Sequence, residues 1–398
     1  MKRLLIAAAL SLAFASHAQD ALRPEVGKPL QAAREHLLAK RYKEALAKVR
    51  EADAARDKTP DEQTTIERMR LSAALAGGDN DQAARAFEAL AEAKKLPQAD
   101  QLRLMESLAG GYYRAKDTSR ALRWAERYIK EGGTSPGMRQ LVQQAQVDAG
   151  DFASVARTVQ AELAADEKAG RIPPEERLQL LAYSQQKLND TPGYVATLEK
   201  LVTHHPKESY WSDLIARVQR KPGFSDRYAL DIYRLKLATG TMRDSGDYTE
   251  AAQLAVQAGY PVEAKKIVEQ GYASGALGKG AEAERHKRLS ALVEKTVGAD
   301  ADSLAQQTSE ASAARSGDAL ISAGFRHAMR GDAGKGAKLI EQGIAKGQLK
   351  RADEAQLRLG IAQLRAGRKA DALKTLRGVK GADGSADIAR LWVLGAGA

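Results

Sequence analysis

The sequence has no cysteine and is poor in aromatic residues and proline. Without cysteine, the chain can be neither a disulfide-stapled domain nor a lipoprotein attached through an N-terminal cysteine. Aromatic residues make up 5% of the 398 residues, prolines number 11, and no long run of alternating β-branched residues occurs, so we expect no sheet. Together with abundant alanine, this composition predicts an all-α protein.

Long hydrophobic runs are also missing, apart from one at the N-terminus. An apolar stretch, residues 4–15, follows Lys2 and Arg3 and precedes a small-x-small cleavage site that ends at Ala18. This stretch is shorter than the roughly 20 residues that a membrane-spanning helix needs. The pattern predicts that residues 1–18 are a cleavable signal peptide, and it favours a periplasmic protein of a Gram-negative bacterium without stable membrane insertion.

The charges do not gather on one segment. The chain has 62 basic and 51 acidic residues, and loss of Lys2 and Arg3 with the leader would leave a net charge of +9. Basic and acidic residues alternate, as in Arg34-Glu35, which is typical of solvated helix surface and not of a nucleic-acid-binding face. We therefore expect no nucleic-acid partner. A weak attraction to anionic envelope polymers or lipid head groups stays open, beside the simpler explanation that the charge favours solubility.

The segment Asp318 to Val379 contains the same helix pair twice, 36 residues apart. The matching positions are Gly324 and Gly360, Gly331 and Gly367, Gly336 and Ala372, and Ile340 and Leu376. A second matching set has i, i+4 and i+7 spacing, which places each copy on one helix face: Ile321, Phe325 and Ala328, then Leu357, Ile361 and Leu364. A glycine inside a helix costs about 1 kcal/mol relative to alanine, so these small residues indicate close helix crossing.

This layout resembles the tetratricopeptide repeat, whose 34-residue unit has small residues at its eighth and twentieth positions and an apolar residue at its twenty-fourth. With Gly336 as the twentieth position, Gly324 is the eighth and Ile340 the twenty-fourth. The same roles are filled in the next unit and in an earlier one by Ala372, Gly360 and Leu376 and by Ala264, Ala252 and Val268. The chain departs from the family pattern at His327 and Gln363, where an aromatic residue is usual, and no proline closes these units.

The resemblance implies a right-handed α-solenoid of tetratricopeptide-like helix pairs. In the N-terminal half the small positions are spaced by 38, 38 and 34 residues, at Ala45, Ala83, Ala121 and Val155. We predict divergent repeats over residues 19–203, an aromatic and basic junction over 204–240, further repeats over 241–380 and a capping helix within 381–398. The expected helices cover residues 30–39, 42–54, 64–76, 82–93, 99–115, 119–130, 173–188, 194–203, 247–258, 261–272, 281–297, 303–315 and 386–394, after an unstructured lead at 19–27.

The junction holds many of the chain's few aromatic residues, including Trp211 and Phe224, beside several arginines. Two interpretations stay open. It is either a ligand-binding cleft in which cations lie over aromatic rings, or a packed contact between two arrays of repeats. The spacing of Leu214, Ile215 and Val218 favours the packed contact. From His204 onward the chain also resembles a group of uncharacterised periplasmic tetratricopeptide-repeat proteins of Gram-negative bacteria, which implies no catalytic role.

Short motifs with catalytic associations lack their usual context. Gly133 to Gly137 matches a G-x-S-x-G nucleophile elbow, but a helix precedes it where the elbow requires a strand. Ser184 and Lys187 match S-x-x-K without the partner motifs. The Glu-Ser pairs at 106–107 and 208–209 lack the segment that follows the catalytic glutamate of lytic transglycosylases. The adjacent His204 and His205 do not fit a metal site, and Gly278-Lys279-Gly280 does not fit a phosphate-binding loop. We therefore predict no catalytic residue, cofactor or metal.

The sequence thus favours a non-enzymatic scaffold that binds another envelope protein or peptide, with its oligomeric state left open. A glycan-binding accessory factor acting through the segment around Trp211 is the second hypothesis, and an unrecognised hydrolase the third. The tetratricopeptide register places the first helices of the C-terminal repeats along the concave side. The candidate partner-binding residues are Phe325, Ile361 and Arg365, with Trp211 and Phe224 as the alternative surface.

Overall fold

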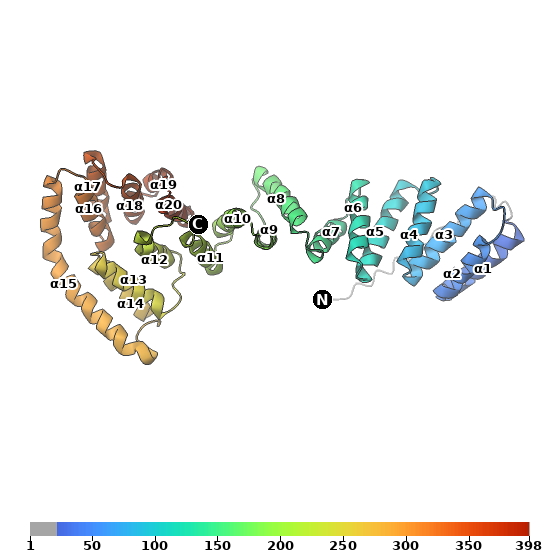
Figure 1. The fold of residues 1–398 in the computed structure, drawn as a ribbon, viewed down its shortest axis with the longest axis horizontal. Coiled ribbons are helices and arrows are strands. Elements are labelled where there is room, and N and C mark those ends of the chain that lie inside the picture. Colours follow the sequence, from blue (N-terminus) through green and yellow to red (C-terminus); the bar gives the residue numbers. More distant parts are fainter. Residues whose placement is uncertain (1–21, 398) are drawn as a thin grey trace. The chain divides into compact units, whose positions relative to one another are not determined.

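The structure is a computed structural model that describes residues 22–397. Within this range every regular element is a helix, and most helices form antiparallel pairs that follow one another along the chain (Figure 1). The predicted all-α solenoid is confirmed. The predicted signal peptide, residues 1–18, lies outside the described residues. None of the helices in the described range is both long enough and apolar enough to cross a membrane.

The chain divides into two compact units, Met1–Val155 and Ala156–Ala398. The division falls inside α8 (Phe152–Lys168), whereas the sequence predicted boundaries at residues 203 and 240. The second unit includes the helices before residue 203 because the last helix of the chain packs against one of them, as described below.

The first unit is a stack of helix pairs. Its helices are α1 (Pro24–Leu38), α2 (Tyr42–Asp53), α3 (Pro60–Gly77), α4 (Asn80–Glu92), α5 (Gln98–Arg114), α6 (Thr118–Lys130) and α7 (Pro136–Asp148). Each second helix contacts the next first helix, and α1 also contacts α3, as α5 contacts α7. The small residues Ala45, Ala83 and Ala121 are fully buried, so the predicted spacing of helix crossings is confirmed in this unit.

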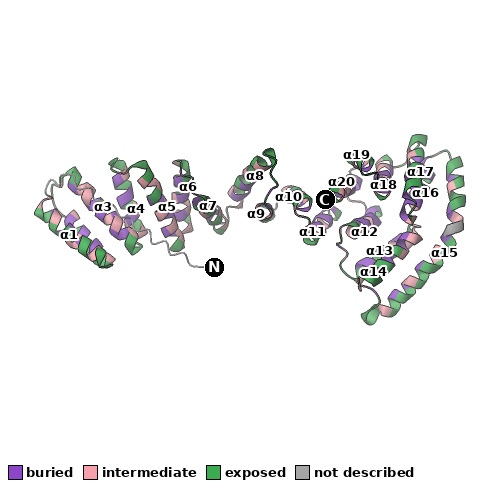
Figure 2. Cartoon of the chain, turned by 180° about the vertical axis from the view of Figure 1, so that it is seen from behind, coloured by how far each residue is buried: buried purple, intermediate pink, exposed green. Residues whose placement is uncertain are grey.

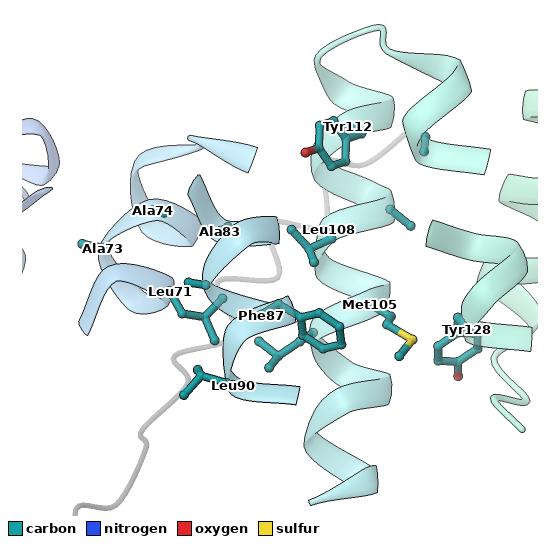
Figure 3. Close-up of a cluster of buried hydrophobic side chains, with 14 of the residues drawn as sticks. Leu71, Ala73, Ala74, Ala83, Phe87, Leu90, Met105, Leu108, Tyr112 and Tyr128 are labelled. Carbon is teal, nitrogen blue, oxygen red and sulfur yellow. The ribbon is translucent and has the colours of Figure 1, made fainter. Parts of the chain in front are cut away.

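Large apolar side chains fill the space between these pairs. Figure 3 shows Phe87 on α4 beside Leu90 and pointing toward Met105 on α5. Phe87 is fully buried and meets Trp124 of α6 edge to face, with the ring centroids 5.2 Å apart. Burying a side chain of this size contributes about 1.5–3 kcal/mol, so each interface between neighbouring pairs adds stability of its own.

The N-terminal helix starts earlier than predicted. Residues 19–27 were expected to be unstructured, but α1 begins at Pro24, where proline is favoured because the missing N–H would have no helical partner. The start of α3 explains why this turn is ordered. Thr59 and Glu62 form a capping box, and Glu62 also accepts hydrogen bonds from the backbone N–H and the guanidinium of Arg23, at 3.2 and 2.9 Å.

Among the residues that the structure describes, the second unit contains four hairpins and several single helices. Its helices after α8 are α9 (Glu175–Lys187), α10 (Thr191–His204), α11 (Glu208–Gln219), α12 (Ala229–Ala238), α13 (Ser245–Gln257), α14 (Pro261–Ala273), α15 (Ala283–Ala313), α16 (Asp318–Arg330), α17 (Ala333–Lys346), α18 (Ala352–Arg365), α19 (Lys369–Arg377) and α20 (Ser385–Gly397), with two short 3₁₀ turns at Asp226–Tyr228 and Gly280–Glu282. The hairpins are α9 with α10, α13 with α14, α16 with α17, and α18 with α19.

The close helix crossing predicted from the glycines is present. A Cβ atom at Gly324 of α16 would lie 2.7 Å from the carbonyl oxygen of Gly336 on α17, and one at Gly336 would lie 2.5 Å from the carbonyl oxygen of Gly324. A Cβ atom at Gly360 of α18 would lie 2.5 Å from Leu376 of α19. Alanine at Gly324 or Gly336 would force the backbones of α16 and α17 apart, whereas alanine at Gly360 would require the Leu376 side chain to shift.

One long helix replaces two predicted helices. Residues 281–297 and 303–315 were expected to form a pair, but α15 runs through both as a single helix of 31 residues. The intervening segment contains Gly298 but no proline, and a single helix glycine costs only about 1 kcal/mol. Asp300 forms ion pairs with Arg326 and Arg330 of α16, which hold this part of α15 against the next hairpin. Much of α15 is nevertheless exposed (Figure 2).

The last helix connects the two ends of the second unit. α20 packs on α18 and α19, as expected for a cap, and it also contacts α10, α11 and α12. Lys221 pairs with Asp387 at 2.9 Å, and Arg390 pairs with Glu199 of α10 at 2.8 Å. Ile388 of α20 is fully buried. The end of the chain therefore closes onto the helices that begin the unit.

Candidate protein-binding surface

The residue predicted as the main partner anchor is buried. Phe325 on α16 is 0% exposed. Its ring meets that of Tyr260 edge to face, with the centroids 5.8 Å apart. The guanidinium carbons of Arg234 and Arg358 lie 4.9 and 4.8 Å from its centroid. Phe325 thus packs between residues of α12, α18 and the start of α14, and its prediction as an exposed anchor is wrong.

The contacts around Phe325 belong to a buried network of charges. Arg234 donates to both carboxylate oxygens of Glu263 on α14, at 2.9 and 2.7 Å, and to Asp231 at 2.7 Å. The side chains of all three residues are at most 6% exposed. Burial by itself would lower the pKa of Arg234, but the two carboxylates outweigh it and raise that pKa above its usual value. Arg234 therefore stays charged, and its guanidinium and the Glu263 carboxylate each have a charged hydrogen-bond partner.

A second buried arginine extends this network to α18. Arg358 donates to the hydroxyl of Tyr260 at 2.9 Å and to Glu354 at 2.6 and 3.1 Å. Burial would lower the pKa of Arg358, but Tyr260, Asp231 and Glu354 raise it overall. The network thus joins α12, α14, α16 and α18 around one buried point.

The other two residues predicted to bind a partner in the C-terminal repeats, Ile361 and Arg365, also contact the protein's own side chains. Ile361 is fully buried. The side chain of Arg365 is 36% exposed, and its guanidinium lies 3.8 Å from Glu263. Burial and the nearby Arg234 lower the pKa of Arg365, while Glu263 opposes that change. The predicted groove of the C-terminal repeats is filled by the protein's own side chains, because α12 and the start of α14 cover it.

The alternative surface is a packed junction. Trp211 on α11 is 4% exposed, and the end of its indole lies close to Gly395 of α20. Phe224 is half-buried and meets Tyr228 edge to face at 6.2 Å. Gly384 has a φ of +105°, and a Cβ there would lie 2.6 Å from the Phe224 ring, so this close approach requires glycine. Neither aromatic side chain is presented to a ligand.

Features with possible catalytic or metal-binding chemistry have structural partners. Ser135 of the G-x-S-x-G match lies in the loop between α6 and α7, where its hydroxyl donates to Glu106 at 3.0 Å. Ser184 is fully buried, and its hydroxyl donates to the carbonyl oxygen of Leu180. Within residues 22–397, no group of three or more His, Cys, Asp or Glu side chains could hold a metal ion.

An exposed surface with mixed apolar and basic character lies in the first unit. We define the first-helix face as the exposed or half-buried residues Leu37, Leu38, Arg68, Leu75, Ala76, Arg103, Tyr113 and Arg114, on α1, α3 and α5. Leu38 is 75% exposed, the largest fraction among the exposed large apolar side chains described. Leu37, Leu75 and Tyr113 follow one another at 38-residue spacing, so they occupy equivalent places in successive pairs.

The arginines of this face are only weakly neutralised. The side chain of Arg103 is 72% exposed and lies 3.6 Å from Asp100. Arg68 donates to the carbonyl oxygen of Lys95 at 3.3 Å. Neither Arg68 nor Arg114 forms an ion pair with any described residue. The 38-residue spacing is visible in the sequence, but the more regular repeat of the other half led to the prediction of binding residues there.

The comparisons with known proteins agree with this architecture. A family model described as tetratricopeptide repeat matches residues 178–208 and 354–381, which correspond to α9 with α10 and to α18 with α19. A search among curated proteins found no match.

Three solved structures match over much of the chain, at low identity and low TM-score. The complex of the TPR2AB domain of yeast Sti1 with pHSP90 has 13% identity and a TM-score of 0.30, covering 68% of this chain and 98% of that one. Naa15/Naa10 bound to HypK-THB has 14% identity and a TM-score of 0.31, covering 88% of this chain and 53% of that one. Yeast Tom70 has 11% identity and a TM-score of 0.19, covering 93% and 95%.

The two family matches fall on antiparallel helix pairs of the solenoid. In the second match, Gly360 and Ala372 occupy the small positions that the register predicts. The chain is therefore an all-α solenoid in which residues 178–208 and 354–381 match the tetratricopeptide repeat.

Proposed function

We propose that this protein is a non-enzymatic scaffold of the cell envelope that binds a segment of another envelope protein along its first-helix face. The observation that carries the proposal is the exposure of this face, on which Leu38 is 75% exposed and the arginines of α3 and α5 lack strong partners. Tetratricopeptide repeats bind peptides by laying them across several helix pairs at once. Arginine and the aromatic residues tyrosine and tryptophan are the types that most often anchor such contacts, and this face offers Arg68, Arg114 and Tyr113.

At the positions predicted to bind a partner, the first helices of the second unit offer no comparable open surface, which favours the first-helix face of the first unit as the binding site. There, Phe325 and Ile361 are fully buried, and Arg234 and Glu263 occupy the space with their own ion pair. A partner could reach that space only by breaking a buried charge pair, which costs about 3–5 kcal/mol. Glycan binding through Trp211 has no support from its surroundings, since that side chain is 4% exposed.

The periplasmic setting rests on the N-terminal sequence and is part of this proposal. If residues 1–18 are a cleaved signal peptide, protein recovered from the periplasm begins at Gln19, as N-terminal sequencing would show. Recovery of the uncleaved chain in the cytoplasm would overturn the envelope setting, while leaving the binding surface to be judged separately.

The binding surface is tested by site-specific photocrosslinking in intact cells. A photoreactive amino acid is placed at Leu38 or Arg68 on the first-helix face, and at Lys43 or Arg85 as controls. The two control residues are exposed on the second helices α2 and α4. We expect one protein adduct from both face positions and none from the controls. Equal adducts from all four positions would overturn the proposed surface.

A charge-reversal pair tests whether the arginines contribute. Arg68→Glu with Arg114→Glu is expected to reduce the adduct formed at Leu38 at least tenfold, because two charged anchors are lost. Lys43→Glu with Arg85→Glu changes the net charge equally and should leave that adduct unchanged. Circular dichroism confirms that each variant keeps its helicity. An unchanged adduct in the first variant would remove the arginines from the binding surface.

A further inference from the structure

The outward sides of two second helices in the C-terminal hairpins carry an unusual density of cations. We define the lysine face as Lys335, Lys338 and Lys346 on α17 with Lys374 and Arg377 on α19, all of them exposed. On α17 these lysines have i, i+3 and i+11 spacing, which places them within roughly an 80° arc. The buried Gly336 and Ile340 lie on the opposite side of the same helix. The lysine face is thus a stripe that points away from the core.

The 36-residue repeat brings this stripe into register on both helices. Lys338 and Lys374 are equivalent positions, because Gly336 matches Ala372 in the repeat. Ala372 is fully buried, as Gly336 is buried on α17. Arg368, just before α19, reaches Glu341 on α17 at 2.9 Å. The start of α19 is therefore close enough to α17 for one arginine side chain to reach from one to the other.

The carboxylates that could neutralise this stripe are already engaged. α17 and α19 contain six basic residues and two acidic ones, Glu341 and Asp371. Arg368 pairs with both of them, at 2.9 Å in each case. Lys338, Lys374 and Arg377 form no ion pair with any described residue. Asp332 lies just before α17, three residues from Lys335.

The second helices of the first unit show that this charge is not a general property of the protein. α2 has three basic and three acidic residues, and α4 has one basic and three acidic. α6 has four basic residues and one acidic, but its Arg120 and Arg127 pair with Asp81 and Glu88 of α4. Among these second helices, the excess of unpaired cations is largest on α17 and α19.

We propose that the lysine face docks this protein on the surface of a membrane that contains anionic phospholipids. The other exposed residues on the two helices are small or polar, such as Gln342, Ala345 and Ala370. A protein interface would require an apolar core, which this face does not have. Hydrated lysine side chains at the outer side of two helices suit an extended anionic surface, which they approach without inserting. Membrane docking goes beyond the proposed scaffold function and does not depend on it.

The test is co-sedimentation of the full chain with vesicles. Vesicles of phosphatidylcholine with 30% phosphatidylglycerol, a proportion of about one anionic lipid in three, are compared with pure phosphatidylcholine at about 0.1 M salt. We expect binding to the anionic vesicles only. Lys338→Gln with Lys374→Gln should weaken that binding about thirtyfold, because each lysine near an anionic surface contributes roughly a factor of five.

A matched variant separates this face from net charge alone. Lys43→Gln with Lys130→Gln removes two exposed lysines of the first unit and should retain binding within about twofold. Equal losses in both variants, or no loss in either, would overturn the proposal. So would failure of the unmodified chain to bind anionic vesicles. Soluble polyglutamate that binds the chain as tightly as the vesicles do would also overturn it, by assigning the face to an acidic polymer.

Discussion

Replacing Glu263 with glutamine tests whether the buried charge network holds the second unit together. Glu263 receives two hydrogen bonds from Arg234, at 2.9 and 2.7 Å, and the side chains of the pair are 5% and 2% exposed. Glutamine keeps the shape of the side chain but removes its charge. Arg234 stays protonated because its pKa is raised, and it would then keep only Asp231 as a charged partner.

We expect Glu263→Gln to destabilise the second unit by about 3–5 kcal/mol, the usual cost of leaving one charge of a buried ion pair without its partner. This is a large part of the 5–15 kcal/mol that stabilises a typical domain. Because the chain has two compact units, urea unfolding by circular dichroism should be combined with hydrogen exchange of α12 and α14. Exchange assigns the loss to the helices that the pair joins.

The control is Glu294→Gln, which removes a carboxylate from an exposed pair. Glu294 lies 2.8 Å from Lys265, and its side chain is 54% exposed. Surface pairs of this kind contribute about 0–1 kcal/mol, so this variant should unfold almost like the unmodified protein. If Glu263→Gln costs no more than Glu294→Gln, the network does not stabilise the unit and the reasoning is refuted.

Two further predictions concern the ends of the chain. The guanidinium of Arg23 and the backbone N–H of Thr59 lower the pKa of Glu62 to about 2, so the stability it contributes is present above its ordinary pKa of 4.5 and is lost as pH falls toward 2. Glu62→Gln should flatten the change in melting temperature over that range, and an unchanged acid profile would contradict this. Removing residues 385–398 deletes the fully buried Ile388 and Leu391 and exposes the apolar surface that they cover. We expect this to lower the free energy of unfolding by roughly 3–6 kcal/mol. Hydrogen exchange should then speed up in α12 as well as in α18, and faster exchange in α18 and α19 alone would show that α20 does not close the unit.

Local features of the fold could be predicted from the sequence because they depend on residues near one another in the chain. The small residues at Gly324 and Gly336 required two helices to cross closely within one hairpin, and the backbones do approach there. The 38-residue spacing of Ala45, Ala83 and Ala121 likewise marked successive crossings. In both cases the pattern reports packing between a helix and its immediate neighbours, which sequence periodicity encodes directly.

The positions that bind a partner were decided by contacts between distant segments. Phe325 has the spacing of a groove residue, but Arg234 and Tyr260 come from elements more than sixty residues earlier and cover its ring. The 31 residues of α15 and the return of α20 to α10 likewise follow from tertiary packing. A periodic pattern specifies which side of a helix is apolar, but not which distant element buries that side. The sequence by itself therefore determined the repeat architecture, and only the tertiary structure decided which faces remain open.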